Sequence, residues 1–460
     1  MIWTTQELSK ALSLSIAGNR EFGTVQFNSK DIEQGDIFIA LKGMRDGHEF
    51  VEDALNRGAG AAIVSKEVIV VDQAKLILVD DTYEALMDLA EFKRRNSKAK
   101  FITITGSVGK TSTKEATKIM LSAYGKTHAS HGNFNNYIGV PLCLASMPND
   151  TQYAVIEMGM SSKGELSELS KLAIPDIALI TAISEGHIES FNSVREIADA
   201  KCEIFEGMDI NEGIAIVNRD ITTYERCLQN IDRAGMQNVQ TFGKKVDSGV
   251  RFVSSEILED DTLRLSYSID GEELELVIPL IPVHLAENFA AAFAVVKALK
   301  LDPEAASAAI SSFVPLIGRG GLLNVKNGKK EYKIICDYYN ANPQSMKAAL
   351  EYLNLFDNEN KVAILGDMGG LGKFTRELHM SIVPQIKDSG VKKLFLVGES
   401  MKQLKDEFDK DVEVFCFDEA ELLGAEIDKY IIGGELILIK GSRSIGLERV
   451  ATKLGVKNAL

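Results

Sequence analysis

The sequence predicts an α/β protein of three domains. The chain has 460 residues, which is enough for about three domains of roughly 150 residues each. Apolar residues make up 45% of the chain and charged residues 25%, a balance typical of a folded globular protein. Short apolar runs alternate with helical patterns along most of the chain, and this order favours largely parallel sheets covered by helices on both faces.

The charge and the cysteine pattern exclude several classes of function. The 51 basic and 66 acidic residues give a formal net charge of −15, so we expect neither a nucleic acid nor a membrane as partner. A disulfide framework or a zinc knuckle is also disfavoured, because five cysteines are scattered along the chain at Cys143, Cys202, Cys227, Cys336 and Cys416. We find no signal sequence and no apolar stretch of the ~20 residues that a membrane span needs, and we expect a cytoplasmic protein.

Composition and turn signals divide the chain into three parts. The expected domains are residues 1–98, 99–316 and 317–460. The first is a small α/β unit that ends in the basic stretch Lys93–Lys98, which we interpret as a linker. The second holds a mostly parallel sheet, and alternating runs within 235–282 predict an antiparallel appendage to it. The third begins after the turn-rich segment Pro315–Gly321 and repeats a Rossmann-like α/β rhythm.

A glycine turn directly after an apolar strand is the strongest functional signal. The strand Lys100–Thr105 leads into Gly106-Ser-Val-Gly-Lys-Thr111, and apolar residues then recur with helical spacing. Inward-facing amides, the helix N-terminus and Lys110 together suit the β- and γ-phosphates of a nucleotide, and Thr111 can ligate magnesium. Ile104 stands where the strict G-x-x-x-x-G-K-[ST] motif has its first glycine. An ordinary glycine turn capped by a lysine is therefore the alternative.

Three residues follow at or near the ends of later strands. Glu157 ends an apolar run, where doubly wound sheets place ligands, and is either a magnesium ligand or a surface carboxylate. His187 follows the next strand and is either at the same edge or simply polar surface. Lys201 lies on the apolar face of a helix that opens with the capping box Ser193-Val-Arg-Glu196. Either its ammonium reaches water, or burial lowers its pKa and leaves an amine able to form a metal-holding carbamate.

Polar groups in the last part of the chain extend this set. His284 and Asn288 share one helix face and suit a base or a ribose, although a capped core helix explains them as well. Arg319 lies at a domain junction and is either a clamp for a phosphoryl or carboxylate group or part of an interdomain salt bridge. Two loops at the ends of strands supply further polar groups at Asp337, Asn340, Asn342, Ser345, Lys440 and Arg443.

Taken together, these segments resemble the Mur ligase family. Thr105–Ser112 is similar to the family's ATP loop and Gly132–Leu142 to its glycine/asparagine segment. The segment from Asn28 to His48 resembles the N-terminal domain that holds the UDP end of the substrate. The other signals follow in the family's order, namely Glu157-Met-Gly, His187, Lys201, His284, Asn288, Asp337–Pro343 and Lys440–Arg443.

The resemblance implies an ATP- and Mg²⁺-dependent amide ligase. The implied reaction joins D-alanyl-D-alanine to a UDP-N-acetylmuramoyl-tripeptide through an acyl phosphate, giving the pentapeptide precursor of peptidoglycan. The segment Tyr339–Pro343 favours this activity over that of the sibling that adds the third peptide residue. The alternatives are another superfamily ligase, such as a folylpolyglutamate-type enzyme, and a nucleotide-dependent switch without synthesis. We expect a monomer.

The resemblance also implies roles for individual residues. Catalytic roles are expected for Lys110, His187, Lys201 and Arg319. Nucleotide contacts are expected from Gly106, Ser107, Val108, Gly109, Lys110, Thr111, Ser112, Asn288, Arg319, Asp337 and Asn340. The expected metal ligands are Thr111, Glu157, His187 and Lys201. The expected substrate contacts are Ser29, Lys42, Asp46, Asn135, Asn136, Asn342, Ser345 and Arg443. Three positions depart from the usual family residues, namely Lys30, Ala182 and Gly370.

Overall fold

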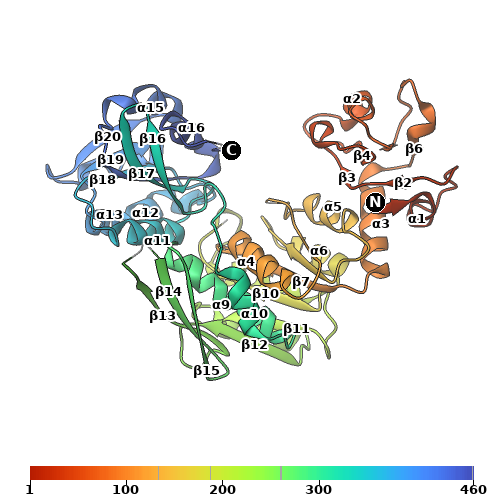
Figure 1. Cartoon of the computed structure of the whole chain (residues 1–460), viewed down its shortest axis with the longest axis horizontal. Helices are drawn as coiled ribbons and strands as arrows, with labels where there is room; N and C mark the ends of the chain where they lie inside the picture. The colour runs from red at the N-terminus through yellow and green to blue at the C-terminus, as the bar shows by residue number, and fades with distance from the viewer. Residues whose placement is uncertain (133, 187, 260–261, 458, 460) are drawn as a thin grey trace.

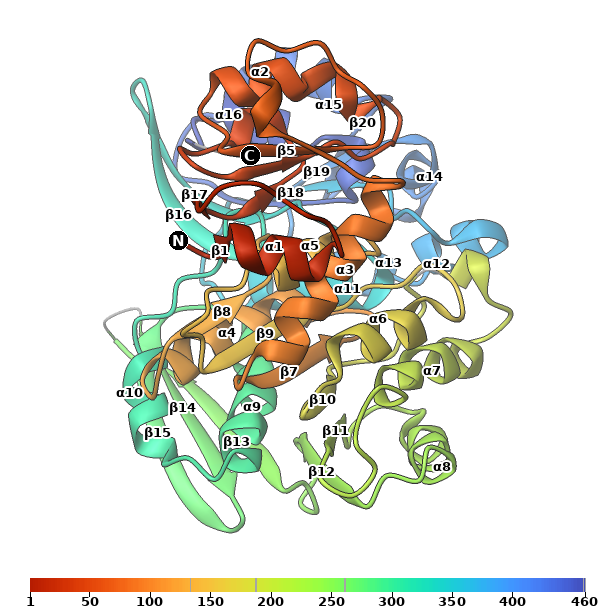
Figure 2. The same ribbon diagram turned by 90° about the vertical axis from the view of Figure 1, so that its right-hand side faces the viewer.

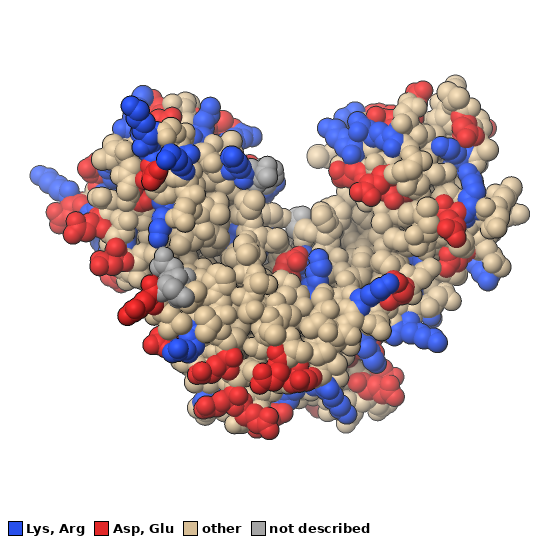
Figure 3. All heavy atoms as spheres, in the orientation of Figure 1, with Lys and Arg blue, Asp and Glu red and all other residues tan. Residues whose placement is uncertain are grey.

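The computed structural model describes residues 1–132, 134–186, 188–259, 262–457 and 459. Three α/β lobes form an open V, with the central lobe at its base and the N- and C-terminal lobes as its arms (Figure 1). The space-filling view shows a deep notch between the two arms (Figure 3). The predicted three-domain α/β fold is therefore confirmed, while the expected boundaries at residues 98 and 316 stay a prediction.

The N-terminal lobe contains a small parallel sheet. Its four strands, in sheet order, are β3 (Val25–Gln26), β4 (Ile37–Ile39), β5 (Ala61–Val64) and β6 (Leu76–Leu78). A separate ribbon pairs β1 (Trp3–Thr4) with β2 (Glu21–Phe22). The helices of this lobe are α1 (Thr5–Ala11), α2 (Val51–Asn56) and α3 (Thr82–Asn96).

The interpretation of Lys93–Lys98 as a linker is wrong for its first four residues, which form the last turn of α3. Figure 2 shows α3 running from the N-terminal lobe down to the central one. Lys93 is buried and donates to the Ile2 carbonyl and to Asn149, and the Arg94 guanidinium donates to two carbonyls that end α6 (Glu165–Ala173). Long stems and carbonyl partners thus allow basic residues to join two lobes.

The central lobe is built on a nine-stranded sheet. Its order is β15-β14-β13-β12-β11-β10-β7-β9-β8. The parallel part comprises β7 (Lys100–Thr105), β8 (Thr127–Ala129), β9 (Tyr153–Glu157), β10 (Ile177–Ile180), β11 (Ile214–Asn218) and β12 (Asn238–Gly243). The antiparallel part comprises β13 (Val250–Ile257), β14 (Thr262–Ile269) and β15 (Glu272–Pro279).

The predicted antiparallel strands are confirmed, but they do not form a separate appendage. The short parallel pairing of β12 with β13 makes them a continuation of the main sheet. Their apolar face packs against α4 (Lys110–Ser122), α9 (Val283–Ala298) and α10 (Pro303–Ile310), which cover one side of the sheet. The other side is covered by α5 (Gly139–Ala145), α6, α7 (Val194–Cys202) and α8 (Tyr224–Arg233).

The C-terminal lobe is a second mostly parallel sheet. Its order is β16-β17-β21-β18-β19-β20, and only the β16–β17 pair is antiparallel. The strands are β16 (Gly321–Asn327), β17 (Lys330–Asp337), β18 (Lys361–Gly366), β19 (Lys393–Val397), β20 (Glu413–Phe417) and β21 (Leu436–Lys440). Its helices are α11 (Pro343–Asn354), α12 (Thr375–Met380), α13 (Val383–Asp388), α14 (Glu399–Lys402), α15 (Ala420–Glu426) and α16 (Glu448–Lys453).

Two chemical features of the whole chain complete the description. All five cysteines are free thiols. Within the described ranges, no helix has the length and apolar character needed to cross a membrane.

The buried Lys93 predicts a pH-dependent stability. Burial lowers the pKa of Lys93 from 10.5 to about 8, so between these values the unfolded chain binds a proton that the folded chain lacks. The free energy of unfolding should therefore rise with pH across this window, by about 2 kcal/mol relative to a Lys93→Met variant. Urea unfolding of both proteins at several pH values measures this difference. Parallel curves for the two proteins would contradict it.

Candidate active site

The glycine turn lies between β7 and α4, at the carboxyl edge of the central sheet. Gly109 is the N-cap of α4 and has a left-handed φ of +83°. A Cβ atom there would lie 2.7 Å from the Asn288 Oδ1, and one at Gly106 would lie 1.9 Å from the Thr181 Oγ1. Both positions therefore need glycine, for backbone conformation at one and for space at both.

Side chains at the end of β10 hold this loop in place. The Ser107 hydroxyl donates to the Ser184 carbonyl over 3.1 Å and accepts from the Ser184 amide over 3.0 Å. The Thr181 hydroxyl donates to the Val108 carbonyl over 2.6 Å. The loop is thus fixed before any ligand arrives, as a preorganised anion site requires.

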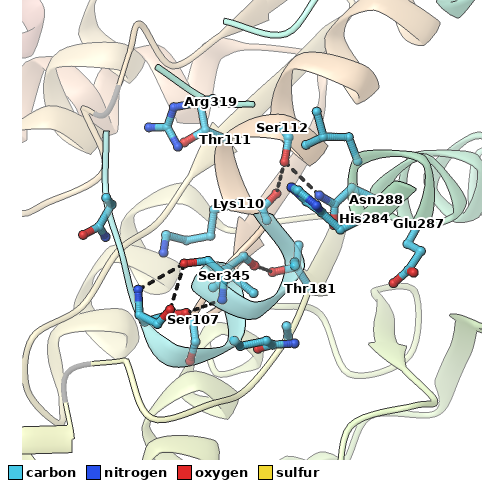
Figure 4. Close-up of a pocket in the computed structure, with 18 of the residues that line it drawn as sticks. Ser107, Lys110, Thr111, Ser112, Thr181, His284, Glu287, Asn288, Arg319 and Ser345 are labelled. Atoms are coloured by element: carbon cyan, nitrogen blue, oxygen red, sulfur yellow. Dashed lines mark hydrogen bonds between the residues drawn. The ribbon is translucent and has the colours of Figure 1, made fainter. Parts of the chain in front are cut away.

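Helix α9 approaches the same loop from the other side of the pocket. The Asn288 amide donates to the Ser112 hydroxyl over 2.9 Å, which joins α9 to the first turn of α4 (Figure 4). His284, one turn earlier, is half-buried at the pocket, and burial together with the nearby Lys440 charge lowers its pKa to about 4. His284 is therefore neutral near pH 7. Both residues line the pocket, as their shared helix face predicted.

Lys110 begins α4 and turns back onto its own loop. Its Nζ donates to the Gly106 carbonyl over 2.7 Å. Burial lowers the pKa of Lys110, the Glu157 charge opposes this shift, and the Arg319 charge adds to it. A half-buried amine with one carbonyl partner among the described residues has hydrogen-bonding capacity left, and a phosphate in the loop would use it.

Glu157 carries an incompletely satisfied carboxylate. Its side chain is 1% exposed. One oxygen accepts from the Asn135 amide over 2.7 Å, while the other is buried and has no partner among the described residues. Thr111, 3% exposed, lines the same pocket. A buried carboxylate oxygen without a donor fits a divalent cation.

The protein alone does not supply a complete cation site within the part of the chain that the structure describes. No group of three or more His, Cys, Asp and Glu side chains lies close enough there to hold a metal ion. Phosphate oxygens of a bound nucleotide and water would have to complete the shell, as is usual for magnesium. His187, an expected ligand, lies outside the described residues.

Lys201 lies on the pocket wall and is 2% exposed. Its amine makes no hydrogen bond to any described residue, and burial, followed by the nearby Lys110 charge, holds its pKa well below 10.5. These observations favour the neutral amine over an ammonium that escapes to water.

The predicted capping box at the start of α7 is only half present. The Ser193 hydroxyl accepts from the Glu196 amide, but the Glu196 carboxylate accepts from Asn192.

The C-terminal lobe adds a buried ion pair to the opposite wall. The Lys440 Nζ lies 2.7 Å from the Asp337 Oδ2 and also donates to the Asn340 carbonyl over 3.1 Å. Burial raises the pKa of Asp337, and the Lys440 charge opposes that shift. The strands β17 and β21 bring these groups together because Asp337 and Lys440 are register partners.

Two arginines flank one tyrosine at the junction of the central and C-terminal lobes. The Arg319 guanidinium lies 3.9 Å from the centre of the Tyr339 ring, and that of Arg443 lies 5.5 Å from it. In the described chain Arg319 has no carboxylate partner, which disfavours the interdomain salt bridge. Figure 4 shows Arg319 at the same pocket as Lys110 and Thr111.

The remaining expected substrate residues divide into two groups. The first group lines the pocket and consists of Asn135, Asn136, Asn342 and Ser345. Two of these side chains also cap α11, since Asn342 and Ser345 form a reciprocal capping box. The second group does not line it and consists of Ser29, Lys42 and Asp46, all in the N-terminal lobe, and Arg443. Their roles stay predictions.

The sequence interpretation missed residues that shape the loop rather than touch a ligand. Thr181 and Ser184 hold the loop, and Tyr339 supports Arg319. A usable signal existed for Thr181, because its hydroxyl directly follows the strand beside β7, whereas Ser184 acts through its backbone amide and carbonyl.

These residues enclose a pocket of about 450 Å³ between the central and C-terminal lobes. A preorganised phosphate loop, a buried carboxylate and several cations define a nucleotide-dependent α/β enzyme. Three family models match consecutive parts of the chain: the Mur ligase family catalytic domain over residues 21–94, the Mur ligase middle domain over 104–296, and the Mur ligase glutamate ligase domain over 323–443.

Individual relatives match almost end to end. A UDP-N-acetylmuramoyl-tripeptide–D-alanyl-D-alanine ligase of Rickettsia prowazekii is 44% identical over 98% of this chain and 99% of its own length. A crystal structure of MurF from Acinetobacter baumannii has a TM-score of 0.83 at 27% identity and covers 99% of both chains. MurF ligase from Thermotoga maritima, solved in complex with ADP, has a TM-score of 0.76 at 25% identity, over 94% of this chain and 97% of its own.

The chain belongs to the Mur ligase family. It is an ATP-dependent enzyme of the ligase class.

The left-handed glycine at the start of α4 predicts a selective defect. Gly109→Ala adds roughly 1–2 kcal/mol of backbone strain and a Cβ atom 2.7 Å from the Asn288 Oδ1. We expect ADP affinity to fall by at least tenfold with a modest loss of thermal stability, because the loop must move to relieve the contact. Calorimetric titration with ADP measures this. A Gly164→Ala variant, also at a left-handed helix N-cap but with open space around it, is the matched control.

Proposed function

We propose that this ligase joins D-alanyl-D-alanine to a UDP-N-acetylmuramoyl-tripeptide at the expense of ATP and so forms the pentapeptide precursor of peptidoglycan. The observation that carries the proposal is the 44% identity, over nearly the whole chain, to a relative that bears this activity in its name. The pocket supports it, because phosphate-binding groups of the central lobe face polar groups of the C-terminal lobe across one cavity. A folylpolyglutamate-type ligase or a non-synthetic switch lacks comparable support.

The chemistry begins with activation of a poor electrophile. A carboxylate does not react with an amine in water, so the terminal carboxylate of the tripeptide first attacks the γ-phosphate of ATP in line, giving an acyl phosphate and ADP. Lys110 would exchange its bond to the Gly106 carbonyl for a phosphate oxygen. Among the described residues, the Arg319 guanidinium contacts the face of Tyr339 and has no carboxylate partner, so it is free to turn toward the γ-phosphate.

Magnesium is the cation that the donor set fits. Thr111 and Glu157 would hold one ion, and His187 with a carbamylated Lys201 would support a second. When bound, magnesium neutralises charge that develops on the transferred phosphoryl group. Lys201 suits carbamate formation because a neutral, buried amine is nucleophilic toward carbon dioxide. Asn135 orients the Glu157 carboxylate by bonding one of its oxygens.

Amide formation completes the reaction. The amine of D-alanyl-D-alanine attacks the acyl phosphate, and inorganic phosphate leaves from the tetrahedral intermediate. Water competes for the same electrophile. The open notch between the arms of the V leaves room for the lobes to close over the bound substrates (Figure 3), and closure would exclude that water.

The remaining assignments complete the proposal. Residues 1–98 would bind the UDP end through Ser29, Lys42 and Asp46, residues 99–316 would bind ATP, and residues 317–460 would complete the ligase site. Asn288, Asp337 and Asn340 would contact the nucleotide, while Asn136, Asn342, Ser345 and Arg443 would contact substrate. Because ATP and UDP-linked precursors are cytoplasmic metabolites, we place the enzyme there, acting as a monomer.

Product analysis tests the proposed function. Purified protein receives ATP, magnesium, D-alanyl-D-alanine and a UDP-N-acetylmuramoyl-tripeptide that carries either diaminopimelate or lysine. We expect mass spectrometry to find a pentapeptide product, with one phosphate released for each amide formed. ATP hydrolysis at the same rate with and without both peptide substrates would instead support a nucleotide-dependent switch.

Lys110 predicts a large and specific loss of turnover. Lys110→Met removes a charge directed at the transferred phosphoryl group, so we expect kcat to fall by about 10²–10³. Thermal stability should change little, because the amine has a single backbone carbonyl as partner. Steady-state kinetics and a melting curve measure the two effects. Wild-type turnover in this variant would remove Lys110 from the mechanism.

The carbamate on Lys201 predicts a spectroscopic signal. Protein incubated with ¹³C-labelled bicarbonate should show a carbamate carbon resonance that is absent from a Lys201→Met variant, because Lys201 is buried at the pocket without an ion-pair partner among the described residues, whereas Lys440 is paired with Asp337. Activity of the wild type should also fall when bicarbonate is removed. The same resonance in both proteins would assign the carbamate to another amine.

A further inference from the structure

A second lysine of α4 lies behind the pocket and does not line it. Lys114 is 0% exposed and lies one turn after Lys110, in the helix that the loop leads into. Its ammonium donates to the Ser130 carbonyl over 2.7 Å and to the Gly132 carbonyl over 3.2 Å, and lies 2.7 Å from the Glu115 carboxylate. All three ammonium protons thus have acceptors, which makes a buried charge tolerable.

The two carbonyls belong to the segment that leaves β8 and leads to Asn135. The Ser130 amide donates to the Val155 carbonyl of β9, and the Ser130 hydroxyl accepts from the Glu157 amide over 3.0 Å. Gly132 has a left-handed φ of +52°. Lys114 therefore holds this segment at the point where it is also bonded to the backbone of Glu157.

The far end of the same segment holds the Glu157 side chain. The Asn135 amide donates to one Glu157 oxygen over 2.7 Å, and the Asn135 carbonyl accepts from the Gly159 amide over 2.7 Å. The free Glu157 oxygen, proposed above as a cation ligand, takes its direction from this bond. The Phe134 amide, next to Asn135, donates to the His131 carbonyl over 3.0 Å, which ties the position of Asn135 to residues 130–132.

We propose that Lys114 is a positioning residue that couples the ATP-loop helix to the orientation of the Glu157 carboxylate. One buried ammonium on α4 fixes the start of the segment whose Asn135 aims that carboxylate. A shift of α4 on nucleotide binding would thus move the Ser130 and Gly132 carbonyls that Lys114 bonds, and through them the Glu157 carboxylate, without direct contact between nucleotide and carboxylate. The inference rests on the proposed function, because it takes Glu157 as a cation ligand.

The test measures binding of Mn²⁺ to the ADP complex by electron paramagnetic resonance, a readout that needs no ligase activity. Lys114→Met should weaken Mn²⁺ binding by roughly tenfold, as loss of a group that orients a metal ligand commonly does, while ADP affinity without metal stays at the wild-type value. Lys114→Gln, which keeps a neutral NH₂ donor group without the charge, should lie between the two. In ligation assays the Mg²⁺ concentration for half-maximal rate should rise in the same order.

Lys93→Met is the matched control, because Lys93 is also a buried lysine bonded to a backbone carbonyl but lies in α3, outside the pocket. It should bind Mn²⁺ like the wild type. Should Lys114→Met fail to fold, Lys114→Gln carries the comparison. Wild-type Mn²⁺ affinity in a folded Lys114 variant, or an equal loss in Lys93→Met, would overturn the inference. Failure of the wild type to make the pentapeptide would instead overturn the proposed function. The Mn²⁺ measurement would still show whether Lys114 affects cation binding, because it does not need ligase activity.

Discussion

The site depends on polar groups that the folded protein leaves short of hydrogen-bond partners. Lys110 has one carbonyl partner, Lys201 has none among the described residues, and one Glu157 oxygen has no donor there. Burial of such groups costs free energy that ordinary packing does not return. A nucleoside triphosphate with its cations would supply the missing partners. The free energy that burial costs would then be offset only when such a ligand binds, which makes the pocket specific for it.

The scaffold brings these groups together because each one follows the end of a strand in a parallel sheet. The central sheet brings the ATP loop after β7, Glu157 after β9 and the hydroxyl residues after β10 to one edge, because parallel strands end on the same side. The C-terminal sheet does the same for Asp337 and Lys440. The pocket forms where the two edges face each other, and the open V leaves it accessible for substrates (Figure 1).

Much of this could be predicted from the sequence, and the exceptions have physical causes. Strand–turn–helix order and helical periodicity are local features of a sequence. They therefore sufficed to predict the loop from Gly106 to Thr111 and the position of Lys201 on the apolar face of its helix. The Lys93–Lys98 stretch misled because a basic run is typical of exposed linkers, whereas here Lys93 bonds the Asn149 side chain and Arg94 bonds two carbonyls, all in the central lobe. Tyr339 beneath Arg319 and Lys114 behind the pocket depend on contacts across the fold, which periodicity does not encode.

The central claim is that the pocket makes a peptide carboxylate reactive by phosphorylating it. Isotope transfer tests it most directly, with the terminal carboxylate of the tripeptide labelled with ¹⁸O and the released inorganic phosphate analysed by mass. If an acyl phosphate forms, each amide bond leaves one ¹⁸O atom in phosphate, because the carboxylate oxygen bridges to phosphorus and departs with it. Amide formation with unlabelled phosphate would contradict the account and place the activating step elsewhere.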